Sequence, residues 1–305
     1  MAICAASNEW DNYETSVEKM GNKGISIQRN TYDCILKECF TQGNGGAAVR
    51  VLNLMQSHSD EMKPNQGDLK LAIGALCRNN NSERGLWKKA LQLIHLSAAA
   101  LEKGDMDVST GSLHVDAYNE ILQCMESDKR WEDALELLET MEEGSGFHAM
   151  PNLATYHRIL NVLVASSQVD AAAELLLSLS KRGKELPTIY SYEIVFSALL
   201  DKRQRKVRWE QAIQLLDSMY EVKITAPTVM YNRVIAACAK AKNINVARDV
   251  FHKMKARKVP ADTVTYNSLI SAAANTGRHQ DALTLFRYCK DGPGVDIITY
   301  TNTIR

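Results

Sequence analysis

Side chains that could bind a metal or act in catalysis are scattered along the sequence without the spacing that such sites need. The seven cysteines include no Cys-x-x-Cys pair, and the seven histidines include no His-Glu-x-x-His motif. The carboxylates Glu132-Asp133 and Glu142-Glu143 are typical of solvated helix charges. We therefore expect reduced cysteines that pack as small apolar residues, no metal site, no cofactor, no small-molecule substrate and no catalytic site.

Charge is distributed unevenly although the formal net charge is zero. Residues 201–260 contain 14 Lys or Arg against 5 Asp or Glu, a net charge of +9, whereas residues 101–150 contain 3 against 13, a net charge of −10. The basic segment begins with the loop-like stretch DKRQRKVR at Asp201–Arg208. Such a stretch is either a solvated surface or a contact for an anion such as phosphate, and both interpretations stay open.

Length and composition indicate a soluble folded chain rather than a disordered or membrane protein. The 305 residues are 45% hydrophobic and 24% charged, and they contain no apolar run long enough to span a bilayer. The first residues, MAICAASNEWDNYE, have no features of a signal or transit peptide. We expect no membrane partner, and any targeting segment would lie outside this sequence.

A repeat of about 35 residues organises the chain. Its first anchor is a tyrosine in an apolar helical segment, and in the second unit Leu69 takes the place of this tyrosine. The anchor tyrosines are Tyr32, Tyr118, Tyr156, Tyr192, Tyr231, Tyr266 and Tyr300. Its second anchor is an alanine that opens a second helical segment, at Ala48, Ala90, Ala134, Ala172, Ala212, Ala247 and Ala282. Each unit is therefore predicted to be a helical hairpin that packs against its neighbours, so the fold class is all-α.

The two anchors set the unit boundaries and the places where the repeat is irregular. We expect complete units at 29–65, 66–114, 115–152, 153–188, 189–227, 228–262 and 263–296, with partial units at 1–28 and 297–305. The second unit is longer than the others, with predicted surface loops at 78–84 and 103–113. Pro, Asn or Asp residues at the junctions should end one hairpin and cap the next. Since the last unit stops within a first helix, we expect the sequence to be part of a longer array.

The tryptophans follow the same register. Trp10, Trp87, Trp131 and Trp209 all lie three residues before the second anchor, which is Tyr13 in the first case. We expect them to pack between successive second helices rather than to stack on a ligand.

The most regular units resemble the pentatricopeptide repeat, of the P type. Val229–Asp262 reads VMYNRVIAACAKAKNINVARDVFHKMKARKVPAD, and Val264–Lys290 reads VTYNSLISAAANTGRHQDALTLFRYCK. The tetratricopeptide repeat is the main alternative, but its Trp-x-x-Leu-Gly-x-x-Tyr motif is absent from the sequence. The resemblance implies a right-handed α-solenoid superhelix of tandem helix-turn-helix repeats, along which single-stranded RNA runs at one base per unit.

The resemblance also implies which residues read the bases. In each unit these are the residue after the anchor tyrosine and the last residue of the unit. Asn232 with Asp262 and Asn267 with Asp296 match the family pairing for uracil. Asn119 with Asn152 matches a pyrimidine pairing, more often for cytosine.

The remaining units match the family pattern poorly. His157 with Thr188 fits no family rule, and Thr301 occupies the base-reading position of the last, partial unit. The other pairs that fit no rule are Asp33 with Asn65, Lys70 with His114 and Glu193 with Pro227. The implied base-stacking residues, two before the tyrosine, are Val229, Val264 and Tyr190.

Two functions follow as hypotheses. The first is an adaptor that binds a partly pyrimidine-rich single-stranded RNA and acts in organellar RNA processing, stability or translation, in a chloroplast or mitochondrion. The second is a scaffold for protein partners that has lost most RNA recognition, which the zero net charge and the four unmatched pairs favour. In this family, nuclease or editing activity belongs to appended domains, whose clustered Asp residues or zinc ligands the sequence lacks, so we expect no enzyme.

Overall fold

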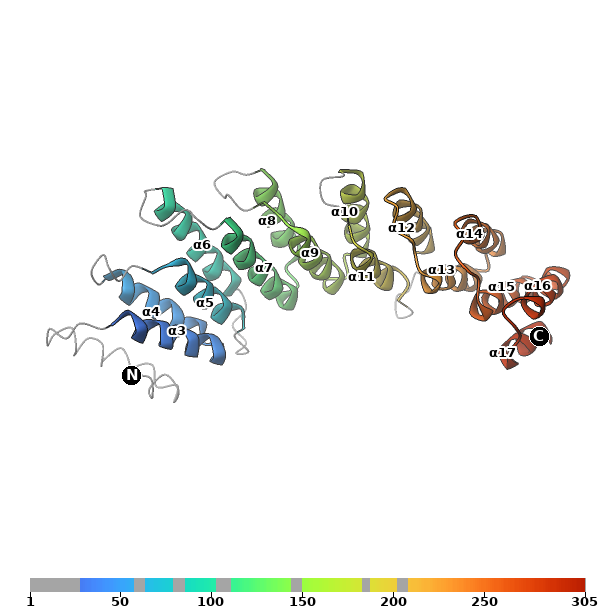
Figure 1. The fold of residues 1–305 in the computed structure, drawn as a ribbon, viewed down its shortest axis with the longest axis horizontal. Helices are drawn as coiled ribbons and strands as arrows, with labels where there is room; N and C mark the ends of the chain where they lie inside the picture. The colour runs from blue at the N-terminus through green and yellow to red at the C-terminus, as the bar shows by residue number, and fades with distance from the viewer. Residues whose placement is uncertain are drawn as a thin grey trace. The chain divides into compact units, whose positions relative to one another are not determined.

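The computed structural model describes residues 28–57, 64–78, 86–102, 111–143, 150–182, 187–201 and 208–304, and all its regular elements in these ranges are α-helices (Figure 1). The chain divides into unit 1, residues 1–167, and unit 2, residues 168–305. Several predicted features lie outside the described residues: the partial unit up to residue 27 with Trp10, most of the loops at 78–84 and 103–113, and residues 202–207 of the basic stretch.

Unit 1 contains three helical hairpins followed by one more helix. Its helices are α3 (Arg29–Gln42), α4 (Gly45–Ser57), α5 (Gln66–Cys77), α6 (Leu86–Glu102), α7 (Gly111–Asp128), α8 (Trp131–Glu143) and α9 (Leu153–Ala165). Each first helix packs on the first helix of the next hairpin, so α3, α5, α7 and α9 are in successive contact.

Helix α7 begins earlier than the sequence suggested. Residues 111–113 were predicted to belong to a surface loop because the segment is rich in Gly and Ser, yet they form the first turn of α7. Once a helix is nucleated, each further residue adds a backbone hydrogen bond, so a weak helix former at its end is tolerated.

Unit 2 has the same design. Its helices are α10 (Val169–Arg182), α11 (Ile189–Leu199), α12 (Trp209–Glu221), α13 (Thr228–Lys240), α14 (Ile244–Ala256), α15 (Thr263–Asn275), α16 (His279–Asp291) and α17 (Ile297–Ile304). Here α13, α15 and α17 are the first helices in successive contact. The predicted all-α hairpin fold is confirmed for the described residues.

Both anchors of the repeat lie in the core. Every second-anchor alanine is at most 4% exposed, which lets the two helices of a hairpin approach closely. The anchor tyrosines are at most 9% exposed in six hairpins, and Tyr300 on α17 is 49% exposed. Burial of these rings supplies much of the apolar stabilisation of each hairpin.

Junction residues cap the first helices, as the sequence predicted. Asn65, Asn152 and Asp262 each accept a hydrogen bond from the backbone N–H three residues later, and each completes a capping box. Pro227, which precedes α13, cannot cap in this way, and no side-chain cap is found there. These three caps fix where α5, α9 and α15 begin.

The cysteines do not all behave as core residues. Cys39, Cys238 and Cys289 are buried, as expected, but Cys34 is exposed. Cys34 lies on α3, whose buried face is formed by Tyr32, Ile35, Leu36 and Cys39, so the helical spacing turns it outward. Trp87 is buried, whereas Trp131 and Trp209 are partly exposed.

Candidate nucleic-acid interface

Two asparagines and two aspartates form equivalent pairs in consecutive hairpins of unit 2. Asn232 is the fifth residue of α13, and its Nδ2 donates a hydrogen bond to Oδ1 of Asp262 at a distance of 3.0 Å. Asn267 is the fifth residue of α15, and its Nδ2 donates to Oδ1 of Asp296 over 3.0 Å. The structure thus brings together both predicted uracil-reading pairs.

Helix capping holds both aspartates in place. The backbone N–H of Thr265 donates to Oδ1 of Asp262 over 2.8 Å, and the backbone N–H of Asp262 donates to the Thr265 hydroxyl over 3.1 Å. Asp296 and Thr299 repeat this geometry at 2.7 and 3.1 Å at the start of α17. Because the carboxylate is fixed by the next first helix, it also fixes which end of the asparagine amide faces it.

The oxygen atoms of the two asparagines differ in their surroundings. Oδ1 of Asn232 accepts a hydrogen bond of 2.6 Å from the hydroxyl of Thr265. Oδ1 of Asn267 is buried and has no hydrogen-bond partner. A buried acceptor without a partner is costly, so the Asn267 oxygen is the stronger candidate for bonding an external donor.

The same hydrogen bonds lower the pKa of both aspartates. Burial alone would raise the pKa of Asp262, but donors from Thr265 and Asn232 outweigh it, and the net pKa is lowered. For Asp296 the hydroxyl and backbone N–H of Thr299, followed by the Asn267 amide, lower the pKa. Both groups are therefore carboxylates at neutral pH, which keeps them acceptors toward the asparagine amides.

Apolar side chains project into solvent one turn before the asparagines. Val229 is 64% exposed and Val264 is 56% exposed, although both belong to well-packed helices. Tyr190, near the start of α11, is also exposed. Ile298 on α17 occupies the same position two residues before its tyrosine and is exposed too; our sequence analysis missed it, although the spacing alone would have found it.

The candidate pair in unit 1 is arranged differently. Asn152 caps α9. Its Oδ1 accepts hydrogen bonds from the backbone N–H and the hydroxyl of Thr155, each with a donor–acceptor distance of 3.0 Å. Oδ1 of Asn119 on α7 is buried without a partner. No hydrogen bond joins Asn119 to Asn152, both of which lie among the described residues. This unit therefore offers an available acceptor but lacks the amide orientation seen in unit 2.

The remaining predicted positions have local roles. His157 on α9 is partly buried, and burial lowers its pKa, so the imidazole is neutral at pH 7. The backbone N–H of Thr188 donates to the hydroxyl of Ser191 over 3.1 Å at the start of α11. Thr301 is exposed, and its hydroxyl donates to the carbonyl of Ile297 over 2.8 Å. His157 belongs to unit 1 and Thr188 to unit 2.

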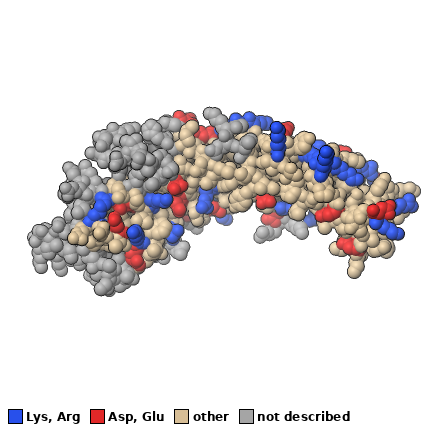
Figure 2. Space-filling model, viewed as in Figure 1, with Lys and Arg blue, Asp and Glu red and all other residues tan. Residues whose placement is uncertain are grey.

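Much of the positive charge of unit 2 lies on its second helices and is paired there. Figure 2 shows Lys and Arg side chains along the edge formed by α10, α12 and α14. Several of these charges bind carboxylates of neighbouring hairpins: Arg208 with Asp170 at 2.8 Å, Lys253 with Asp217 at 2.7 Å, and Arg248 with Asp281 at 2.6 Å. These ion pairs tie hairpins together, which reduces the charge left for an anionic ligand.

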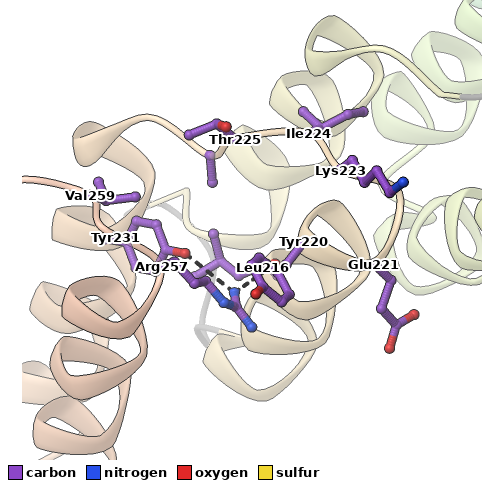
Figure 3. Close-up of a pocket in the computed structure, with 10 residues that line it drawn as sticks. Leu216, Tyr220, Glu221, Lys223, Ile224, Thr225, Tyr231, Arg257 and Val259 are labelled. Atoms are coloured by element: carbon purple, nitrogen blue, oxygen red, sulfur yellow. Dashed lines mark hydrogen bonds between the residues drawn. The ribbon is translucent and has the colours of Figure 1, made fainter.

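A cavity of about 470 Å³ lies at the C-terminal ends of α12 and α14 (Figure 3). Arg257 spans it, donating to the Leu216 carbonyl over 2.9 Å and to the Tyr231 hydroxyl over 3.2 Å. Its guanidinium also lies 4.6 Å from the ring centroid of Tyr220. Arg257 thus links α12 to α13 across the cavity. The residues that line the cavity do not include those of the Asn and Asp pairs.

The described part of the chain has neither a metal-binding cluster nor a membrane-spanning helix. There, no cluster of three or more His, Cys, Asp or Glu could hold a metal ion. Likewise, no described helix is both long and apolar enough to span a bilayer.

Known proteins resemble this chain in sequence. A profile of the PPR repeat family matches residues 227–275, the PPR repeat profile matches 116–145 and 264–292, and the pentatricopeptide repeat domain profile matches 16–66. A pentatricopeptide repeat-containing protein of Arabidopsis thaliana is 26% identical over 174 residues, covering 55% of this chain and 27% of the relative. A second one from that plant, named chloroplastic, is 28% identical over 144 residues, covering 47% and 28%.

Solved structures give matches of low similarity. The pentatricopeptide repeat protein PPR10 from maize is 19% identical with a TM-score of 0.48, covering 99% of this chain and 40% of that one. A complex of PPR10 with an 18-nucleotide RNA element is 17% identical with a TM-score of 0.37, covering 97% and 45%.

This chain spans only about a quarter of the length of its curated relatives. Family profiles nevertheless match near its start, in its middle and near its end, over the same hairpins that carry the buried tyrosine and alanine anchors. On this evidence the chain contains pentatricopeptide repeats in the segments that these profiles match.

Proposed function

We propose that this chain binds single-stranded RNA and acts as an adaptor in organellar RNA processing, stability or translation, by binding rather than by catalysis. The observation that carries the proposal is the pair of identical Asn and Asp contacts, each 3.0 Å long, in consecutive hairpins of unit 2. Equivalent polar pairs one repeat apart are what a reader of consecutive bases requires.

The chemistry of the pairs suits uracil. The pairing edge of uracil presents an N–H donor between two carbonyl acceptors. An asparagine amide offers a carbonyl acceptor beside an N–H donor, so it can bond two adjacent groups of that edge. At Asn267 one N–H is directed to Asp296 and the oxygen has no partner, so the amide is oriented and keeps an acceptor for the uracil N–H.

Access to the amides requires a small movement. Asn232 and Asn267 are each only 7% exposed. A base that reaches them must therefore displace side chains between neighbouring first helices, while Val229 and Val264 supply exposed apolar surface for the face of the base. RNA binding is thus coupled to a slight separation of the hairpins.

The other candidate residues belong to the same proposal with less support. Asn119, Asn152, His157, Thr188 and Thr301 would contribute base contacts without the oriented amide. Tyr190 would stack on a base. Relatives that are named chloroplastic support an organellar location. The proposed organelle is a chloroplast or a mitochondrion.

A second function has one observation in its favour. In unit 1, Lys70 on α5 occupies the position after the anchor of its unit and forms an ion pair of 3.4 Å with Asp116 on α7, two residues before the anchor Tyr118. Charges paired in this way suit a protein contact better than base recognition, so unit 1 is the candidate surface for a protein partner. Retention of a partner after ribonuclease treatment would support this function, and loss of the partner would contradict it.

Fluorescence anisotropy with labelled RNA tests the main proposal. We expect a single strand with adjacent uracils to bind more tightly than an adenine strand of the same length. The affinity for both should fall with rising salt, because phosphate contacts release counterions. Absence of binding to any pyrimidine-rich strand at low salt, or equal affinity for both strands, would overturn the proposal.

A further inference from the structure

Two cysteines meet where α5 and α7 pack together in unit 1. Cys77 is the last residue of α5, and Cys124 lies one turn before the end of α7. Both side chains are partly exposed and line the same cavity, and each thiol shifts the pKa of the other. Among the described cysteines, Cys77 and Cys124 are the two that are partly exposed; Cys34 is exposed, and the others are buried.

The pair is open to small polar molecules. A cavity of about 540 Å³ is lined by both cysteines together with Arg78, Gln123 and Asp128. A reagent of the size of hydrogen peroxide enters such a space easily and finds polar groups to bond. Accessibility of this kind separates a reactive thiol from a buried structural one.

The start of α6 favours a thiolate at Cys124. The backbone N–H of Trp87, the second residue of α6, donates a hydrogen bond to the Cys124 sulfur. The N-terminal amides of a helix carry partial positive charge and stabilise an anion placed there. The pKa of Cys124 is lowered, first by the hydrogen bond from Cys77 and further by the Trp87 amide, against burial and the nearby Asp128.

Cys77 has the complementary property. Its contact with Cys124 and its burial raise its pKa, whereas the Trp87 amide at the start of α6 favours the thiolate at Cys124. The two sulfurs thus differ in role: one is a nucleophile and the other is a neighbouring thiol. This is the arrangement of a redox-sensing cysteine beside a resolving cysteine.

We propose that Cys124 and Cys77 form a peroxide-responsive thiol pair. The Cys124 thiolate attacks one oxygen of hydrogen peroxide, the O–O bond breaks, and hydroxide leaves, giving a sulfenic acid on Cys124. The Cys77 sulfur then attacks the Cys124 sulfur, and the sulfenic oxygen leaves as water. The two thiols lose two electrons and two protons in total, and the peroxide gains them as two molecules of water.

The product would join consecutive hairpins. A Cys77–Cys124 disulfide links the end of α5 to α7, two first helices that are in contact already. The link limits how far these helices can separate, so oxidation would rigidify unit 1. This inference does not depend on RNA binding.

Peroxide titration of the fully reduced chain tests the pair. Free thiols are blocked after each addition, and peptide mass spectrometry measures disulfide formation and oxidation at each cysteine. We expect the Cys77–Cys124 disulfide to form at a peroxide concentration about tenfold below that which oxidises Cys34, the exposed cysteine without these neighbours. Oxidation of Cys34 first, or no linked peptide, would overturn the proposal.

Three variants separate the two roles. In Cys77→Ser a sulfenic acid should persist on Cys124 and react with a dimedone-type probe, whereas in Cys124→Ser the oxidation of Cys77 should be no faster than that of Cys34. Cys34→Ser, the matched control, should leave disulfide formation unchanged. Circular dichroism tests whether each variant is folded. If a variant is not folded, the peroxide titration of the unaltered chain still tests whether the Cys77–Cys124 disulfide forms before Cys34 is oxidised. A folded Cys77→Ser chain without a trappable sulfenic acid on Cys124 contradicts the mechanism.

Discussion

The Nδ2 atom of Asn232 lies 3.0 Å from Oδ1 of Asp262, thirty residues later in the chain, and that same oxygen accepts the backbone N–H of Thr265. One carboxylate therefore caps α15 and orients the amide of the preceding hairpin. Losing the carboxylate would therefore affect both the start of α15 and the position of the Asn232 amide, which we propose to read a base.

Replacing Asp262 with alanine should destabilise the chain. The change removes the cap of α15 and the acceptor for Asn232, and loss of such a cap costs about 1 to 2 kcal/mol of unfolding free energy. Urea unfolding followed by circular dichroism measures the effect. Asp262→Asn, which keeps a side-chain oxygen, should lose less.

Asp249 provides the matched control for this experiment. It is exposed on α14, so Asp249→Ala should change the unfolding free energy by no more than about 0.5 kcal/mol. If Asp249→Ala and Asp262→Ala are equally destabilising, the capping role assigned to Asp262 is wrong.

Replacing Asn267 with leucine should weaken binding to RNA with adjacent uracils about tenfold, which corresponds to about 1.4 kcal/mol. Leucine has nearly the same shape but offers neither a donor nor an acceptor. The control is Asn275→Leu at the other end of α15, where the asparagine is exposed, and it should bind like the unaltered chain. An equal loss of affinity in both variants, measured by anisotropy at one salt concentration, would count against base reading by Asn267.

Stability in unit 2 should fall in acid. The pKa values of Asp262, Asp296 and Asp217 are lowered in the folded chain; burial of Asp217 acts against this, but hydrogen bonds from Lys253 and Arg257 outweigh it. A carboxylate with a lowered folded pKa stabilises the fold above its unfolded pKa of about 3.9, and that contribution is lost as the pH falls through the folded value.

Thermal unfolding between pH 7 and pH 3 measures this dependence. We expect the midpoint to be flat near neutral pH and to drop as the pH falls below about 4. Asp217→Asn should show a shallower drop than the unaltered chain, because one linked proton is removed. A slope that stays the same in this variant would show that Asp217 is not among the groups responsible.

The repeat register could be read from the sequence because it depends on spacing. Tyrosine and alanine anchors recur at nearly constant intervals, which defines the units. The pairing of Asn232 with Asp262 came from the family resemblance, and the structure shows the two side chains in contact. Contacts that break the repeat could not be read in this way. Cys77 meets Cys124 across the irregular second unit, whose loop lengths do not follow the period.

Long charged side chains limit sequence-based prediction further. The excess of basic residues in 201–260 suggested a phosphate contact as one interpretation, but Lys253 and Arg257 reach across to Asp217 on another hairpin. Whether a flexible side chain meets a carboxylate or solvent depends on which rotamer the neighbouring helix permits, and the linear charge count does not contain that information.

Replacing Lys242 with glycine should stabilise the chain. Lys242 has a positive φ of 57°, in the turn between α13 and α14, where its backbone N–H donates to the Ala239 carbonyl. The equivalent residue between α15 and α16 is Gly277, with φ of 71°. A side chain in this conformation costs about 1 to 2 kcal/mol, and part of the gain is offset by the greater freedom of glycine in the unfolded chain.

We expect Lys242→Gly to raise the unfolding free energy by about 0.5 to 1 kcal/mol and Gly277→Ala to lower it by a similar amount, both measured in urea. Lys240→Gly is the control, because Lys240 still belongs to α13 and glycine in a helix is unfavourable. It should therefore destabilise the chain although it removes the same side chain and the same charge. If both lysine variants shift stability in the same direction, charge and not backbone conformation decides the effect at this turn.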